Sequence, residues 1–103
     1  MKSYILIKES IDLGHAMLAS AHAGAAILTT WGDDPVVKDW VANSFRKVVC
    51  KVNDEEFEQF AAMAVAGYGR VMTESGLDNQ RIAIVFKPRE EWPKPFKFLR
   101  LYK

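Results

Sequence analysis

The residues in this sequence that are best suited to chemistry are two histidines and one glutamate. His15 and His22 are seven positions apart, which on an α-helix places them on one face, about 10 Å apart along the axis. A neutral histidine serves as a general base or polarises a carbonyl group. Glu74 stands at the start of a turn-rich segment, where its carboxylate could orient a base or a water molecule. We therefore take His15, His22 and Glu74 as candidate catalytic residues.

Each candidate also has a purely structural interpretation. His22 could be a core histidine that donates a hydrogen bond to a backbone carbonyl. His15 could be a solvated residue in the first turn of a helix, and Glu74 could be a turn residue in contact with solvent. The two histidines are too far apart to share a metal ion directly. The chain has no glycine-rich phosphate loop and no ligand cluster with metal-site spacing, so we expect neither a metal nor a cofactor.

Two further residues are weaker candidates for a nucleophile. Ser20 is two positions from His22 and so lies on a different part of the helix, which argues against a catalytic triad. Cys50 is flanked by valines in a predicted buried strand. It is expected to behave as a small hydrophobic residue and not as a thiolate.

The composition limits the class of protein. The chain has 103 residues, half of them hydrophobic, and a net charge of +1, which predicts a single domain over residues 1–103 with a buried core. The charge excludes a globally basic nucleic-acid binder, and the single cysteine excludes a disulfide framework and favours a reducing, cytoplasmic setting. We expect no signal peptide and no membrane-spanning segment.

The charge is unevenly distributed. The last ten residues contain four basic side chains and no acid, Lys94, Lys97, Arg100 and Lys103. Their charge is +4, which leaves −3 for residues 1–93 because the total is +1. This basic tail alternates with apolar residues. It fits either a phosphate-contacting patch or a solubilising face above an apolar strip that anchors the tail.

The hydrophobic pattern predicts how these residues are positioned. We expect four strands and three helices, with strands at 4–7, 48–52, 70–73 and 82–86 and helices at 14–30, 35–43 and 53–67. The tail at 96–102 is either a last helical turn or extended. Helical crossovers make the first three strands parallel where they are neighbours, and the short link before the fourth favours an antiparallel pair.

The expected fold is an α/β three-layer sandwich. It has a four-stranded mixed sheet with helices on both faces, in the order β-α-α-β-α-β-β, followed by a C-terminal tail. Ligands of open α/β sheets bind outside the carboxyl ends of the parallel strands. In this chain that edge consists of residues 8–15, 53–55 and 73–75.

Several segments resemble one known family. The family pattern G-K-x-A-A-Q-C-x-H-A is matched by residues 14–23, a K-V-V-L-K-V strand with an acidic helix start by 47–56, a strand ending in Gly-Pro by 82–88, and an L-K-L-Y close by 99–102. Over nearly its whole length the chain resembles a type-2 peptidyl-tRNA hydrolase. It is most similar to the divergent peptidyl-tRNA hydrolase domain-containing branch, through residues 79–84, 88–91 and 99–103.

This resemblance implies the fold and a reaction, cleavage of the ester that joins a peptide to tRNA. His22 and Glu74 would position or activate water, His15 would supply charge in place of the family's lysine, and the basic tail would hold tRNA phosphates. The family's glutamine is replaced by Ala19, its cysteine by Ser20, and its threonine has no counterpart.

These replacements leave other functions open. One alternative is a catalytically impaired module that binds tRNA or a protein, and another is an enzyme that acts on a small molecule in the same cleft. The chain also has three Trp, six Phe and three Tyr, more than a small core readily buries. Since exposed aromatic patches often mark interfaces, we expect a homodimer.

Overall fold

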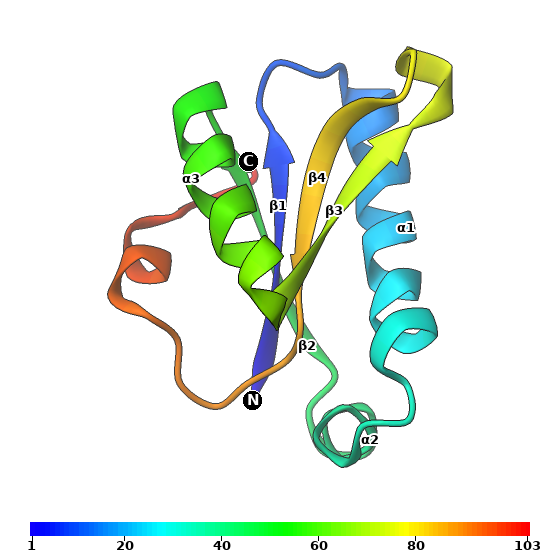
Figure 1. Cartoon of the computed structure of the whole chain (residues 1–103), viewed down its shortest axis with the longest axis vertical. Coiled ribbons are helices and arrows are strands. Elements are labelled where there is room, and N and C mark those ends of the chain that lie inside the picture. Colours follow the sequence, from blue (N-terminus) through cyan, green and yellow to red (C-terminus); the bar gives the residue numbers. More distant parts are fainter.

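A five-stranded sheet lies between two helical layers in the computed structural model, which describes residues 1–103 (Figure 1). The elements are β1 (Lys2–Lys8), α1 (Leu13–Trp31), α2 (Pro35–Asn43), β2 (Arg46–Val52), α3 (Asp54–Met63), β3 (Gly69–Glu74), β4 (Gln80–Phe86) and β5 (Arg100–Leu101). The predicted α/β fold is confirmed, with helices on both faces and the element order β-α-α-β-α-β-β. The tail adds a fifth, two-residue strand to the four that were predicted.

The strand order is β3-β4-β1-β2-β5. β1 and β2 are parallel, with Tyr4 opposite Val48 and Leu6 opposite Cys50. All other pairs are antiparallel, including the β3–β4 pair that the short link predicted. β1 lies at the centre, which explains why Tyr4 to Ile7 are apolar without alternation: both of its faces are covered.

Each helix begins at a residue that satisfies free backbone N–H groups. Asp12 caps α1 by accepting a hydrogen bond from the backbone of His15. Asp34 caps α2, and Pro35 follows at the first helical position, where its missing N–H costs nothing. Asn53 and Glu56 form a reciprocal capping box at the start of α3.

The two faces of the sheet have different cores. On one face α1 packs through small side chains, Ala16, Ala19, Ala23 and Ala26, which let the helix backbone approach Ile5 and Ile7 of β1. On the other face α3 and the tail contribute aromatic rings, Phe57, Phe60 and Phe96, against Leu6 and Phe86. None of the helices combines the length and the apolar character that crossing a membrane requires.

The link from α3 to β3 departs from the predicted helix. Regular α-helix stops at Met63 and is followed by a wider π-type turn over Ala64–Tyr68. Gly67 has φ of 109°, a left-handed conformation that favours glycine. A side chain at Gly69 would come within 2.9 Å of the Phe86 ring and the Val85 carbonyl oxygen, so this glycine permits the close start of the β3–β4 pair.

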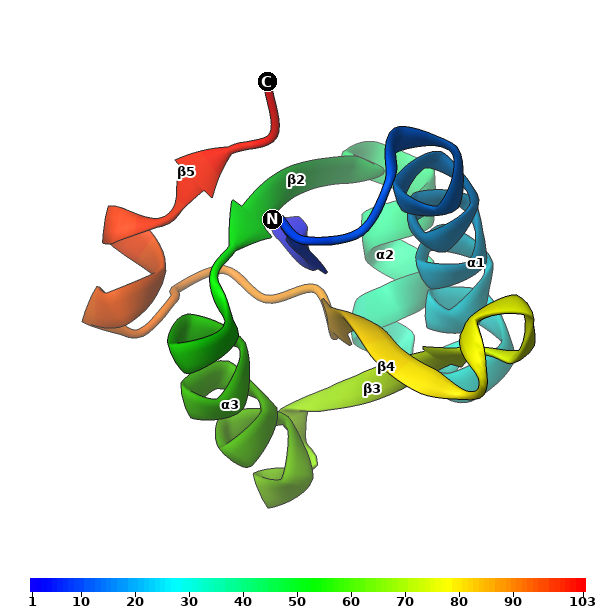
Figure 2. The same cartoon turned by 90° about the horizontal axis from the view of Figure 1, so that it is seen from above.

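The tail contains both a helical turn and an extended segment, the two alternatives that the sequence left open for it. Lys94–Phe98 is a 3₁₀ turn, and Arg100–Leu101 is extended as β5 beside β2. Phe96 anchors this segment with a side chain only 2% exposed. Figure 2 shows the tail passing α3 to reach the edge of the sheet.

Candidate active site

The start of α1 holds a histidine paired with a carboxylate. Oδ1 of Asp12 lies 2.7 Å from Nδ1 of His15, and Oδ2 accepts from the His15 backbone N–H at 3.2 Å. The bond from the His15 ring, followed by the bond from its backbone, lowers the pKa of Asp12 below its ordinary 3.8. An ionised carboxylate only accepts hydrogen bonds, so Nδ1 of His15 carries a proton, and in the neutral ring Nε2 has the lone pair of a base.

Glu74 lies beside the free side of the His15 ring. Its Oε1 accepts a hydrogen bond from the Gly76 backbone N–H at 3.0 Å. A methyl group at Gly76 would lie 3.4 Å from that oxygen and 3.6 Å from Nε2 of His15. Both functional atoms therefore lie within 4 Å of one point, and the absence of a side chain at Gly76 keeps the space there open.

This site is open to solvent. The His15 side chain is 34% exposed, and Gly14 and Gly76 beside it are exposed. The residues lie where β1 ends and where β3 turns into β4, so the site falls at the predicted carboxyl edge of the sheet. It can accommodate a reacting group that is part of a large molecule.

His22 is not part of this group. It lies two helical turns beyond His15, is exposed, and its ring forms no hydrogen bond. The interpretation of His22 as a core histidine is wrong, because the buried face of α1 runs through Ala19, Ala23 and Ala26 and His22 flanks it. Of the three candidate catalytic residues, the structure brings His15 and Glu74 together.

The two weaker candidates behave as expected from the sequence. The hydroxyl of Ser20 donates to the carbonyl oxygen of Met17 at 2.8 Å, within its own helix. Cys50 is 1% exposed, and burial raises the pKa of its thiol to about 11 although the charge of Lys2 opposes the shift. The thiol is therefore neutral near pH 7.

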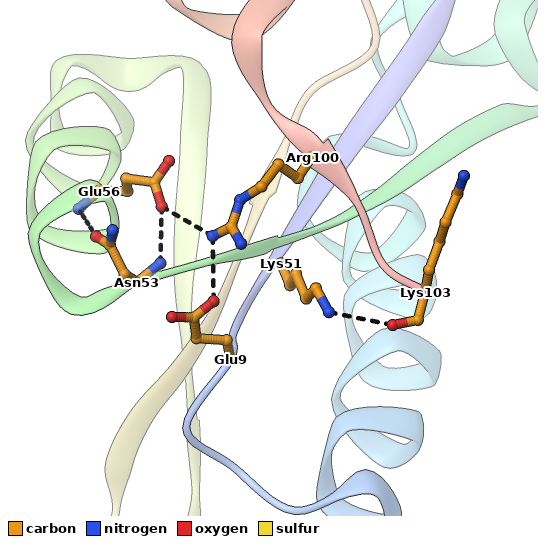
Figure 3. A network of polar contacts seen from close by, with 6 residues as sticks. All are labelled: Glu9, Lys51, Asn53, Glu56, Arg100 and Lys103. Carbon is orange, nitrogen blue, oxygen red and sulfur yellow. Dashed lines mark hydrogen bonds and ion pairs between the residues drawn. The ribbon is translucent and has the colours of Figure 1, made fainter.

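No three His, Cys, Asp or Glu side chains come together in a group that could hold a metal ion. Two acidic side chains near the parallel strand ends instead pair with one basic side chain. Nη2 of Arg100 lies 3.1 Å from Oε2 of Glu9 and 3.3 Å from Oε1 of Glu56 (Figure 3). The hydrogen bond to Glu9 is the main cause of a raised pKa of Arg100.

The basic tail is therefore not one charged stripe. Arg100 is neutralised by Glu9 and Glu56 and fastens the tail across the ends of β1 and β2. Lys94 lines a cavity next to α3, whereas Lys97 lines another cavity on the side of Lys2. The side chains of Lys94, Lys97 and Lys103 remain exposed, so three of the four predicted phosphate contacts are free to meet an anion.

Sequence reasoning missed two residues of the site, Asp12 and Gly76. The helix was predicted to begin at Gly14, which left Asp12 in the preceding loop. An aspartate directly before a helical segment is itself an N-cap signal, and a helix starting at Leu13 would have revealed it. Nothing local marks Gly76, because its role depends on the distant ring of His15.

No protein-family model matches the chain, and no curated protein matches it either.

Proposed function

We propose that this protein is a peptidyl-tRNA hydrolase-like enzyme that cleaves the ester between peptide and tRNA, with His15 as its general base. The observation that carries the proposal is the Asp12–His15 pair, whose free Nε2 lies beside Glu74 over Gly76. A carboxylate on Nδ1 fixes the ring and its tautomer, as a histidine base requires. The order of segments that resembles the family supplies the substrate class.

The reaction uses one water molecule. Nε2 of His15 removes a proton from the water as the water oxygen bonds to the ester carbonyl carbon, while the carboxylate of Glu74, whose Oε1 lies beside the same open point, orients the water. The bond from that carbon to the ribose oxygen then breaks, and the proton passes from His15 to the ribose oxygen. Asp12 stabilises the imidazolium between the two transfers.

The openness of the site fits a large substrate. The exposed lysines of the tail are available for phosphates farther from the site, with Lys94 beside α3 and Lys97 beside Lys2. The direct test is release of free tRNA from an N-acetyl-aminoacyl-tRNA by the purified protein. We expect turnover above a mock purification. No release, at protein concentrations where an active type-2 hydrolase completes the reaction, would refute the proposed activity.

A binding module is the second candidate. Its supporting observation is Ala19, which is fully buried and presents no polar group where the family has glutamine. Such a module binds tRNA without cleaving it. With three phosphate contacts the logarithm of the binding constant would fall with the logarithm of salt concentration with a slope of about −2 to −3. Turnover of the ester rules this candidate out as the sole function.

Self-association stays a prediction. The exposed aromatic rings, Phe45, Tyr68 and Phe98, lie on different segments, and Leu13 and Met17 add exposed apolar surface on α1. Sedimentation equilibrium at increasing protein concentration tests it, since a homodimer predicts a rising average mass. Only monomer at the highest concentration would contradict it.

A further inference from the structure

A cavity that does not include His15 lies between the end of α3 and the tail. Its volume is about 270 Å³, and its walls are formed largely by aromatic rings, those of Tyr68, Phe86, Trp92 and Phe96. In the β3–β4 pair Phe86 lies opposite Gly69, at the far end from the Glu74–Gln80 pair of the candidate active site. The cavity is therefore separate from the proposed reaction.

The only charged side chain in its wall is that of Arg89. Its guanidinium lies 5.2 Å from the Tyr68 ring centroid and 5.5 Å from the Trp92 ring centroid, within the range of cation–π attraction. Arg89 forms no ion pair, whereas Arg81 pairs with Glu58 and Arg100 with Glu9. A half-buried guanidinium without an acid keeps its N–H donors available to an anion.

A second donor in the same wall lacks an acceptor. The indole Nε1 of Trp92 is buried and has no hydrogen-bond partner, and no other buried side-chain nitrogen or oxygen is in this state. The corresponding atom of Trp40 is satisfied, since it donates to the carbonyl of Arg46 at 3.0 Å. An indole nitrogen only donates, and the Trp92 side chain lines this cavity together with Arg89. The guanidinium of Arg89 is therefore the donor that is open to an acceptor in the cavity.

We propose that this cavity binds a small carboxylate with a flat apolar body. The carboxylate accepts hydrogen bonds from Arg89 in a bidentate pair, and the ring of Trp92 borders the ligand. The body of the ligand packs among the rings of Tyr68, Phe86 and Phe96. The volume of about 270 Å³ is just below the usual range for drug-sized ligands, about 300–1,000 Å³, so the site selects a compact molecule of one or two rings.

The test uses indole-3-acetate as the probe and its neutral amide, indole-3-acetamide, as the matched control. Binding is followed by ¹H–¹⁵N NMR of the three tryptophan indoles, with the Trp92 signal assigned by W92F. We expect a saturable shift of the Trp92 N–H resonance, with the Trp40 resonance unchanged. The amide is expected to bind at least about tenfold more weakly, because it forms no charge-assisted pair with Arg89.

Three variants separate binding from folding. R89L is expected to weaken indole-3-acetate binding at least about tenfold. R46L removes an exposed arginine that also lacks an ion pair and is expected to leave this binding unchanged. A66F places a ring at an exposed position in the cavity wall and is expected to abolish binding. Equal affinity for the acid and the amide, wild-type affinity in R89L, or no saturable shift of Trp92 would each overturn the proposal.

Discussion

The carboxylate of Asp12 holds the ring of His15 at 2.7 Å through one oxygen and caps the helix that carries His15 through the other. One side chain therefore fixes both the start of α1 and the orientation of the histidine. The ring cannot rotate without losing the bond to Asp12, and Nε2 is left toward Gly76 and Glu74. The predictions below follow from this arrangement and from the packing around it.

The first prediction separates the two roles of Asp12. Asparagine caps a helix about as well as aspartate, so D12N should preserve the fold and the melting temperature. Its neutral amide neither fixes the tautomer of His15 nor stabilises an imidazolium. We expect a loss of about 10²- to 10⁴-fold in the rate of tRNA release. A wild-type rate in a folded D12N protein would contradict the role given to Asp12.

The second prediction concerns the open space over Gly76. G76A adds one methyl group at 3.4 Å from Glu74 and 3.6 Å from His15, ordinary contact distances that the fold tolerates. The methyl group covers Nε2 of His15, so the rate should fall while the melting temperature stays close to that of the wild type.

G24A is the matched control for this change. A methyl group at Gly24 meets no atom within 4 Å, and replacing glycine by alanine within α1 should stabilise the protein by about 0.5–1 kcal/mol. Its rate of tRNA release should equal that of the wild type. Equal rates for G76A and G24A would show that Gly76 does not border the reacting group.

The third prediction concerns pH and the pair of Asp34 with Lys87. The hydrogen bond from Lys87, followed by the backbone N–H of Val36, lowers the pKa of Asp34 below 3.8 in the folded protein. The unfolded state therefore binds this proton more readily, so the stabilisation is present above pH 3.8 and is lost as the pH falls through the folded pKa. D34N keeps a helix cap but has no such dependence.

Urea unfolding of wild type and D34N at several pH values between about 6 and 2 tests the pair. The difference in free energy of unfolding between the two proteins should shrink as the pH falls. A difference that stays constant over this range would contradict the stabilising role of the pair.

The fourth prediction concerns the anchor of the tail. The ring of Phe96 is 2% exposed and lies 4.9 Å from the Phe60 and Phe86 rings, centroid to centroid. F96A should lower the free energy of unfolding by about 3–5 kcal/mol. Phe98, two residues further along the chain, is 73% exposed, so F98A should change the free energy of unfolding little. Similar urea midpoints for the two variants would show that Phe96 does not anchor the tail.

Much of the fold could be predicted because its signals are local. The continuous apolar run Tyr4–Ile7 indicates a strand covered on both faces. Capping residues mark two helix starts, Asp34-Pro35 for α2 and the Asn53–Glu56 pair for α3. The tail lacks such signals. Its strand β5 depends on Arg100 meeting Glu9 and Glu56, which are 91 and 44 residues away in the sequence.

The candidate site could be predicted only in part, because its geometry also depends on contacts between residues far apart in the sequence. Glu74 and His15 were named from their positions at one edge of the sheet, but their approach depends on the turn that places Gly76 between them. The exposure of His22 could not be predicted from the sequence of α1, because alanines occur all around this helix. Ala19 and Ala23 are buried whereas Ala21 and Ala25 are exposed, so the alanine-rich sequence does not identify the face that packs on the sheet.

The most direct test of His15 as the general base compares H15Q with H22Q in a single-turnover assay of tRNA release from N-acetyl-aminoacyl-tRNA. Both variants replace a histidine of α1 by glutamine, but only His15 is bonded to Asp12 and faces Glu74. We predict that H15Q lowers the rate by about 10²- to 10⁴-fold and that H22Q keeps the wild-type rate. A loss in H22Q with full activity in H15Q would contradict the assignment.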